Sequence, residues 1–269
     1  MSNANHLPRL AGIRLHPIKS LDPISVNEAR IGPNGGLELD RVWALYSTDG
    51  KWINGKRAPA IHLIRATYKP DLSSVGFSAP EDHRGIEPVR VKFPQDTERA
   101  AKWFSEYFEQ PVVVRYAREG YPDDGVVPGP TIVSTASLEA VCDWFPGLTL
   151  NESRERFRAT LEIDGVPAFW EDQLFGPDEN YAVRFKIGAV AFEGSHPCAR
   201  CPVPPRNPRT GEQILGFSRK FSDMRRSSLP PWTPASRFDH YYRLSTNTRI
   251  PSSEQGKLLR LGDAVVVAS

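Results

Sequence analysis

The sequence is poor in cysteine and has no long hydrophobic run, and each absence excludes a class of protein. Its 269 residues include three cysteines, too few for a disulfide scaffold. No run approaches the ~18 apolar residues that span a bilayer, and the first ten residues lack the apolar core of a signal peptide. These absences predict a cytoplasmic protein of a reducing compartment, without a membrane segment.

The sequence also lacks a marked excess of either charge. Its 34 Lys and Arg against 32 Asp and Glu give a formal charge of +2. Nucleic-acid and membrane-surface binders normally concentrate basic residues, so we expect neither kind of partner. The 25 prolines and 20 glycines exceed the usual share and are spread along the chain. They predict many turns between short elements, in two small domains or one large one.

Alternating apolar and polar residues predict a succession of short strands. Asp49-Gly50 between two apolar runs is typical of a hairpin turn. Short strands at this spacing favour a barrel or a sandwich. The strands are expected at residues 13–15, 24–26, 42–46, 52–53, 61–68, 89–93, 112–116, 157–163, 183–187 and 258–267, the last interrupted at 262–263.

One amphipathic helix is predicted in the first half of the chain. Apolar residues recur at helical spacing from Ala100 to Phe108. Asp96 or Thr97 can cap the start of this helix, and Pro111 enforces its end. We therefore expect the apolar stripe to pack in a core.

A second helix is predicted to begin with Ser134 or Thr135 as its cap and to stop before Pro146-Gly147. Cys142 lies on the apolar face of this helix. We expect its thiol to pack as a small buried apolar group.

Residues 119–130 are rich in Gly, Pro and Asp and predict a domain boundary. We expect two intertwined β-rich domains with a few helices, spanning residues 8–120 and 121–269. In the second domain, the alternation over 157–163 predicts that Arg158 and Thr160 share one face of a strand.

The sharpest local motif is Cys198-Ala199-Arg200-Cys201, and four interpretations compete for it. A thioredoxin-like redox pair needs a cysteine at a helix N-terminus. The prolines at 202, 204 and 205 do not start a regular helix, which disfavours that interpretation.

The second interpretation is a zinc site. Zinc takes four nitrogen or sulfur ligands, and His196 with the distant His240 can complete a set with the two cysteines. The third interpretation is a pair of buried structural thiols without special chemistry.

The fourth interpretation is a thiolate that binds a soft metal carried on an anionic organic scaffold. Arg200 lies between the two cysteines, and six further Arg and Lys residues follow by position 226. Cationic neighbours stabilise a thiolate, and arginine holds phosphate through two parallel hydrogen bonds. The residues alone leave these alternatives open.

Five motifs in a fixed order add a resemblance to a known family. They are His-Pro-Ile-Lys-Ser (16–20); Gly-Gly-Leu (35–37) with Asp-Arg-Val-Trp (40–43); Phe-Arg-Ala-Thr (157–160); Cys-Ala-Arg-Cys (198–201) with Asn-Pro-Arg-Thr-Gly-Glu (207–212); and Phe-Asp-His-Tyr (238–241) with Leu-Gly-Asp-Ala-Val (261–265). This order resembles the MOSC-domain proteins, in the branch of the mitochondrial amidoxime-reducing component. The resemblance covers nearly the whole chain.

The resemblance implies a small N-terminal β-barrel domain followed by a MOSC β-barrel domain. Between them it implies a molybdenum–molybdopterin cofactor; pyridoxal phosphate is not expected. Cys201 would be the metal ligand and the catalytic residue, and Cys198 its neighbour. The implied cofactor-binding residues are Lys19, Ser20, Arg41, Arg158, Thr160, Ala199, Arg200 and Tyr241. Thr160 stands where the family pattern has asparagine.

The implied activity is reduction of small N-hydroxylated substrates. The chain has too few cysteines for an iron–sulfur cluster and lacks a Gly-x-Gly-x-x-Gly fingerprint. Electrons are therefore expected from an external partner, either cytochrome b5-like or ferredoxin-like with its reductase. The alternative is a cofactor or sulfur carrier without reductase activity. Mitochondrial association is expected only if the chain is a truncated form.

Overall fold

The computed structural model describes residues 7–80, 85–122 and 127–268. Residues 123–126 of the predicted boundary segment lie outside this description. The strands are β1 (Arg9–Leu15), β2 (Ile24–Ser25), β3 (Glu28–Arg30), β4 (Trp43–Ser47), β5 (Arg65–Tyr68), β6 (Val75–Ser78), β7 (Val89–Val91), β8 (Val112–Tyr116), β9 (Ile132–Ser134), β10 (Leu161–Asp164), β11 (Val183–Ile187), β12 (Val190–Ala199), β13 (Arg243–Arg249), β14 (Leu258–Arg260) and β15 (Val265–Val267). The α-helices are α1 (Thr97–Phe108), α2 (Thr135–Trp144), α3 (Leu150–Phe157) and α4 (Phe217–Ser227), and the short 3-10 helices are η1 (Pro59–Leu63), η2 (Trp170–Leu174), η3 (Ala235–Arg237) and η4 (Ser252–Glu254).

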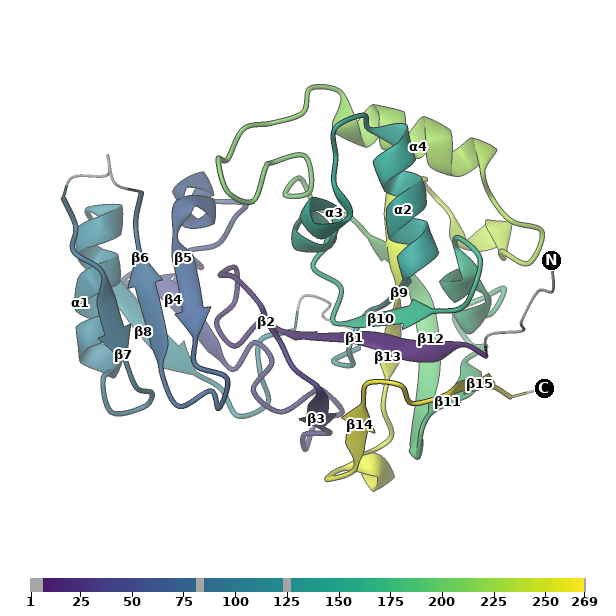
Figure 1. Cartoon of the computed structure of the whole chain (residues 1–269), viewed down its shortest axis with the longest axis horizontal. Coiled ribbons are helices and arrows are strands. Elements are labelled where there is room, and N and C mark those ends of the chain that lie inside the picture. The colour runs from purple at the N-terminus through teal and green to yellow at the C-terminus, as the bar shows by residue number, and fades with distance from the viewer. Residues whose placement is uncertain (1–6, 81–84, 123–126, 269) are drawn as a thin grey trace.

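The larger lobe is built on an eight-stranded sheet in the order β15-β11-β12-β13-β9-β10-β1-β2 (Figure 1). Strand β10 runs parallel to β9 and antiparallel to β1. Buried aliphatic and aromatic side chains of β1, β10, β11 and β12 form one continuous core beside this sheet. Helices α2, α3 and α4 cover another part of the lobe over a second core that includes Phe157, Phe217 and Phe221.

The smaller lobe contains β4 to β8 and α1, shown on the left of Figure 1. Strand β4 pairs with β8, and β5, β6 and β7 form a three-stranded sheet. Trp103, Phe104 and Tyr107 of α1 are buried in a core with these strands. The apolar stripe predicted from the sequence is therefore the core face of α1.

The first strands of the chain belong to the larger lobe. Leu10 and Ile13 of β1 are packed with β10, and β3 pairs with β14 near the end of the chain. Residues of the first predicted domain thus contribute to the sheet of the second, as expected for intertwined domains. The boundary at residues 120 and 121 stays a prediction.

The fold class predicted from the sequence, mostly β with a few helices, is confirmed. Helix α2 begins as predicted, because the Ser134 side chain accepts a hydrogen bond from the backbone N–H of Ser137 at 3.1 Å. The Asp49-Gly50 hairpin is also present, with Ser47 N–H donating to the Lys51 carbonyl at 2.9 Å. Within the described residues, no helix is both long and apolar enough to cross a membrane.

Several local predictions are wrong. Residues 59–63 form η1 instead of the start of a strand, and only 65–68 are extended. Residues 150–157 form α3, so the alternation over 157–163 does not mark one strand. Helix α4 follows the proline-rich loop, and the apolar spacing of Phe217 and Phe221 was the signal for it. By contrast, the interrupted strand predicted at 258–267 is present as β14 and β15, which pair with β3 and β11, respectively.

Candidate functional site

A cavity of about 940 Å³ lies between the two lobes. Trp52 and His62 line it from the smaller lobe, and Arg158 and Cys201 from the larger one. The sequence-predicted residues that line it are Lys19, Ser20, Arg41, Arg158, Thr160, Ala199, Arg200 and Cys201. Residues from four of the five motifs therefore converge on one cavity.

The charge of the cavity wall is mainly positive. Among the described lining residues, eight are Lys or Arg and three are Asp or Glu. Several of the cations are held in fixed positions by contacts with the protein. An anionic group bound here would be attracted by the wall and would find donors already in place.

The Cys-x-x-Cys motif spans the end of strand β12. Cys198 lies within the strand, next to its last residue, and Cys201 lies two residues beyond its end; both line the cavity. Neither stands at a helix N-terminus, so the geometry of a thioredoxin-like pair is absent. Both thiols are partly exposed, and both are free cysteines in the described part of the chain.

Arg200 is fixed between the cysteines and helix α3. Its Nη1 donates a hydrogen bond to Cys198 Sγ at 3.1 Å, and its Nη2 donates to the Phe157 carbonyl. Its guanidinium carbon lies 5.5 Å from the centre of the Phe157 ring. The remaining Nε is buried without a hydrogen-bond partner in the described structure, which leaves one donor beside the cavity.

Arg41 joins the two halves of the site. Its guanidinium is paired with Asp40 and donates to Thr160 Oγ1 at 3.4 Å and to the Arg158 carbonyl at 3.5 Å. The Arg41 side chain is buried, with 10% of its surface exposed. Asp40 accepts a hydrogen bond from the backbone N–H of His16 at 2.7 Å.

The acid–base state of this network follows from its burial. Burial would raise the pKa of Asp40, but Arg41 and His16 outweigh it and hold that pKa below its usual range. Burial and the nearby Arg158 lower the pKa of His16 to about 3. Asp40 is therefore ionised and His16 neutral near pH 7, and the carboxylate fixes the Arg41 guanidinium.

Arg158 reaches the cavity from the end of helix α3. It is the C-cap residue, with a left-handed backbone at φ 52°, and its Nη2 donates to the Leu21 carbonyl at 2.8 Å. The predicted strand face shared by Arg158 and Thr160 is wrong. Thr160 nevertheless lines the same cavity as Arg158. Its backbone N–H donates to Thr131 Oγ1 at 3.3 Å just before β10 begins.

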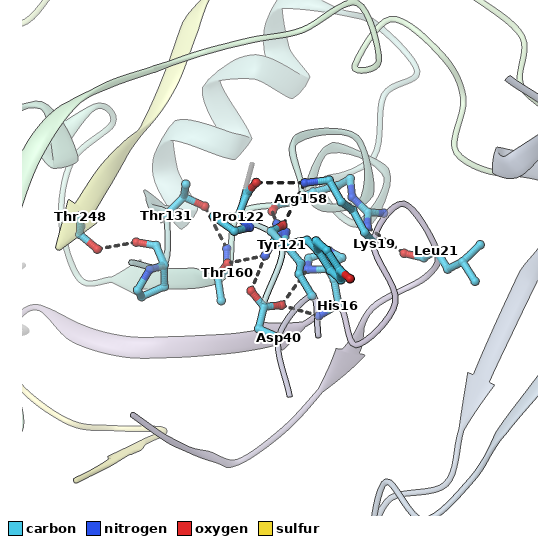
Figure 2. A network of polar contacts seen from close by, with 12 residues as sticks. His16, Lys19, Leu21, Asp40, Tyr121, Pro122, Thr131, Arg158, Thr160 and Thr248 are labelled. Atoms are coloured by element: carbon cyan, nitrogen blue, oxygen red, sulfur yellow. Dashed lines mark hydrogen bonds and ion pairs between the residues drawn. The ribbon is translucent and has the colours of Figure 1, made fainter. Parts of the chain in front are cut away.

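Lys19 and Ser20 enter the site on a turn after β1. Lys19 Nζ donates to the carbonyls of Tyr121 and Pro122 at 2.9 and 3.1 Å, as Figure 2 shows, and lies 5.2 Å from the centre of the Trp52 ring. Ser20 has φ 74°. Ser20, Arg41 and Arg158 thus all have left-handed backbones, which are uncommon for residues other than glycine and concentrate at functional sites.

Tyr241 differs from the other predicted residues because it does not line the cavity. Its ring stacks on Phe238 with centroids 5.8 Å apart and lies under the Arg226 guanidinium at 4.8 Å. The cofactor-binding role of Tyr241 therefore stays a prediction, for a residue outside the cavity lining.

The zinc interpretation is not supported either. Among the described residues, no group of three His, Cys, Asp or Glu side chains is placed to hold a metal ion. His196 Nε2 instead lies 2.9 Å from Asn247 Nδ2, and the exposed His240 stands next to Asp239.

The cavity residues that were not predicted as part of the site include Trp52, His62, Arg243 and Asn247. Each is brought there by tertiary contacts. The Arg243 side chain, for example, donates to the Pro197 carbonyl at 2.7 Å across the β12–β13 pair. Only Trp52 had a signal in the sequence, as the residue after the predicted hairpin turn.

The residues at the cavity fit a molybdenum–pterin group. Cys201 supplies a thiol, the ligand type that soft metals prefer. Arg41, Arg158 and Lys19 carry N–H groups of the kind from which phosphate and pterin oxygens accept hydrogen bonds. The buried Arg200 Nε and His62 Nε2, which have no hydrogen-bond partner in the described structure, are further polar atoms that a bound polar group can satisfy.

Comparison with known families agrees with this geometry. The model of the MOSC N-terminal beta barrel domain matches residues 7–111, and that of the MOSC domain matches residues 131–266. This chain belongs to the MOSC-domain family. The β-barrel domains implied by the motif order are thereby confirmed for this MOSC protein.

Individual relatives of the MOSC protein are distant but cover much of it. Mitochondrial amidoxime-reducing component 1 of Xenopus laevis is 24% identical, over 93% of this chain and 79% of the relative. Mitochondrial amidoxime reducing component 2 of Bos taurus is 26% identical, over 73% of this chain and 66% of the relative. Molybdenum cofactor sulfurase of Homo sapiens is 24% identical over 82% of this chain, which spans only 29% of that relative. These names support a function connected with the molybdenum cofactor.

Proposed function

We propose that this MOSC protein binds a molybdenum–molybdopterin cofactor in the cavity between its lobes and reduces small N-hydroxylated substrates. The observation that carries the proposal is the convergence of Cys201 with Lys19, Arg41, Arg158 and Arg200 on one cavity. A thiol and fixed cations around about 940 Å³ suit a soft metal on an anionic scaffold.

The chain's own residues have distinct roles in this proposal. Cys201 binds the metal through its thiolate. Arg41 and Arg158 orient the anionic part of the cofactor, with Arg41 kept in place by Asp40 and Thr160. Lys19 contributes a positive charge beside Trp52. When bound, the cofactor supplies a two-electron redox centre.

The electrons come from an external protein, either cytochrome b5-like or ferredoxin-like with its reductase. The three cysteines include the metal ligand, so the chain cannot also hold a four-cysteine iron–sulfur cluster. Because the electrons must come from outside, purified protein given NADH alone should show no turnover, whereas a chemical reductant should support turnover. The cytoplasmic location also stays a prediction.

The decisive experiment is a molybdenum and pterin assay on protein made in a host that synthesises the cofactor. We expect both in about equal amounts per chain, with the metal lost from Cys201→Ala. Cys142→Ala is the matched control, since Cys142 lies on helix α2 and does not line the cavity. Wild-type protein without molybdenum and pterin would contradict the proposal.

A second candidate is a cofactor or sulfur carrier without reductase activity. The similarity to molybdenum cofactor sulfurases favours it, as does the Arg200 hydrogen bond to Cys198, since a cation stabilises a thiolate. Mass spectrometry after incubation with a sulfur donor separates the two functions. A carrier would show a persulfide on a cavity cysteine and no reduction of N-hydroxylated compounds.

A further inference from the structure

His62 stands in the wall between two cavities. It lies in η1 of the smaller lobe and lines the large cavity and also a second one of about 20 Å³. The residues common to both linings are Ser20, His62, Arg156, Arg158 and Val203. Among these five side chains, the imidazole of His62 is the one that can both accept and donate a proton near neutral pH.

The ring of His62 is enclosed but has spare hydrogen-bonding capacity. The residue is 9% exposed, and its Nε2 is buried without a hydrogen-bond partner in the described structure. Gly55 packs directly against it, since a Cβ at Gly55 would lie 2.5 Å from Nε2 and 3.3 Å from Val203 Cγ2. Space for the imidazole therefore depends on the glycine.

The surroundings of His62 keep the imidazole neutral. Burial and the positive charges of Arg158, Arg206 and Arg65 lower the pKa of His62 to about 4, and a hydrogen bond with the Gly55 backbone opposes this lowering. A neutral imidazole carries one N–H and one lone pair. It can accept a proton on one nitrogen while it releases the proton of the other.

The smaller cavity has the size and polarity to hold a water molecule. Its volume of about 20 Å³ is close to that of one water. Asp22, Glu155, Arg65, Arg156, Arg158 and Arg206 are its charged lining residues. Asp22 has 28% of its side chain exposed, and burial raises its pKa against the opposing charge of Arg65. This carboxyl thus connects the small cavity with solvent.

We propose that His62 relays protons from a water in the small cavity to the substrate in the large cavity. The inference rests on the proposed reductase function and identifies its proton route. Reduction of an N-hydroxylated substrate breaks the N–O bond and consumes two electrons and two protons, giving the N–H product and water. The external donor supplies the electrons, and the route through Asp22, the water and His62 supplies the protons.

The principal test compares His62→Asn with His240→Asn in cofactor-loaded protein. Asparagine keeps a polar group but does not relay protons, and His240 is an exposed histidine that does not line the cavity. We expect kcat of the His62 variant to fall by about 10²-fold, the scale of general acid–base catalysis. KM and the molybdenum and pterin content should match wild type, and the His240 variant should be unchanged.

Chemical rescue distinguishes a relay from a merely structural role. His62→Ala leaves space beside Gly55, and added imidazole should restore part of its kcat. Unchanged kcat in His62→Asn, or a loss of kcat in His62→Ala that imidazole does not rescue, would overturn the relay. If the molybdenum content of these variants is normal, either result leaves the proposed function standing.

Two measurements need no cofactor. A high-resolution crystal structure should show one water in the small cavity within hydrogen-bond distance of His62. Nitrogen-15 NMR should show the His62 ring neutral down to about pH 5. A dry small cavity, or a ring that is already protonated at pH 7 and so has no lone pair to accept a proton, would refute the relay whether or not the chain binds molybdenum.

Discussion

Arg41 and Thr160, which are 119 positions apart in the sequence, meet where the arginine Nη1 donates to the threonine Oγ1 at 3.4 Å. This contact joins the turn before β4 to the segment before β10 in the wall of the cavity. Through Arg41 it also connects Asp40 with the Arg158 carbonyl. The position of Arg41 is therefore set by both halves of the chain.

Arg41→Lys should weaken cofactor retention and stability together. Lysine keeps the charge but cannot contact Asp40, Thr160 and the Arg158 carbonyl at once. We expect lower molybdenum content per chain and a free energy of unfolding lower by about 1–3 kcal/mol. Metal analysis and urea unfolding measure the two effects. Arg184→Lys, with a side chain 79% exposed, is the control, and equal behaviour of the two variants would refute the bridging role.

Cys198→Ser should retain the metal. Serine oxygen can still accept the hydrogen bond that Arg200 donates to Cys198 Sγ at 3.1 Å. Because Cys201 is the proposed ligand, we expect the molybdenum content of this variant to stay near that of wild type. Metal analysis beside Cys201→Ala gives the comparison, and comparable loss in both variants would mean that the thiols act as a pair.

His16→Phe should reduce the sensitivity of the fold to acid. The pKa of His16 is lowered to about 3 by burial and by Arg158. The unfolded chain takes up a proton below about 6.5 and the folded chain does not, so the wild type loses stability as the pH falls. Between pH 7.5 and 5 the loss is on the order of 2 kcal/mol larger in wild type than in the variant. Urea unfolding at both pH values tests this, and parallel losses would contradict it.

Glu171→Gln should stabilise the protein at alkaline pH. Glu171 is 1% exposed, and burial and then the neighbouring Asp172 raise its pKa to about 7. The unfolded chain releases this proton at lower pH than the folded chain, so wild-type stability declines from about pH 4.5 to 7. We expect the gain from glutamine to be about 2 kcal/mol greater at pH 8 than at pH 5. Thermal or urea unfolding at the two pH values decides it, and a gain independent of pH would exclude ionisation as the cause.

The sequence predicted elements whose signal is local. The stripe from Ala100 to Phe108 specified α1 because burial of one helix face needs only the 3.6-residue period. Ser134 likewise marked the start of α2 through its own hydrogen bond. Where local patterns conflict, tertiary packing prevailed: the alternation from Phe157 favoured a strand, but α3 ends there and leaves Arg158 in a left-handed cap.

The amino-acid sequence alone determined the fold class, and it contains the ordered motifs that place the protein among MOSC-domain proteins. Which side chains meet at the cavity was decided only by the tertiary structure. Tyr241 belongs to a matching motif yet lies elsewhere, whereas His62 belongs to none and forms part of the wall. The reason is physical: a cavity is formed by distant segments whose packing fixes the direction of each side chain, and no local pattern encodes that direction.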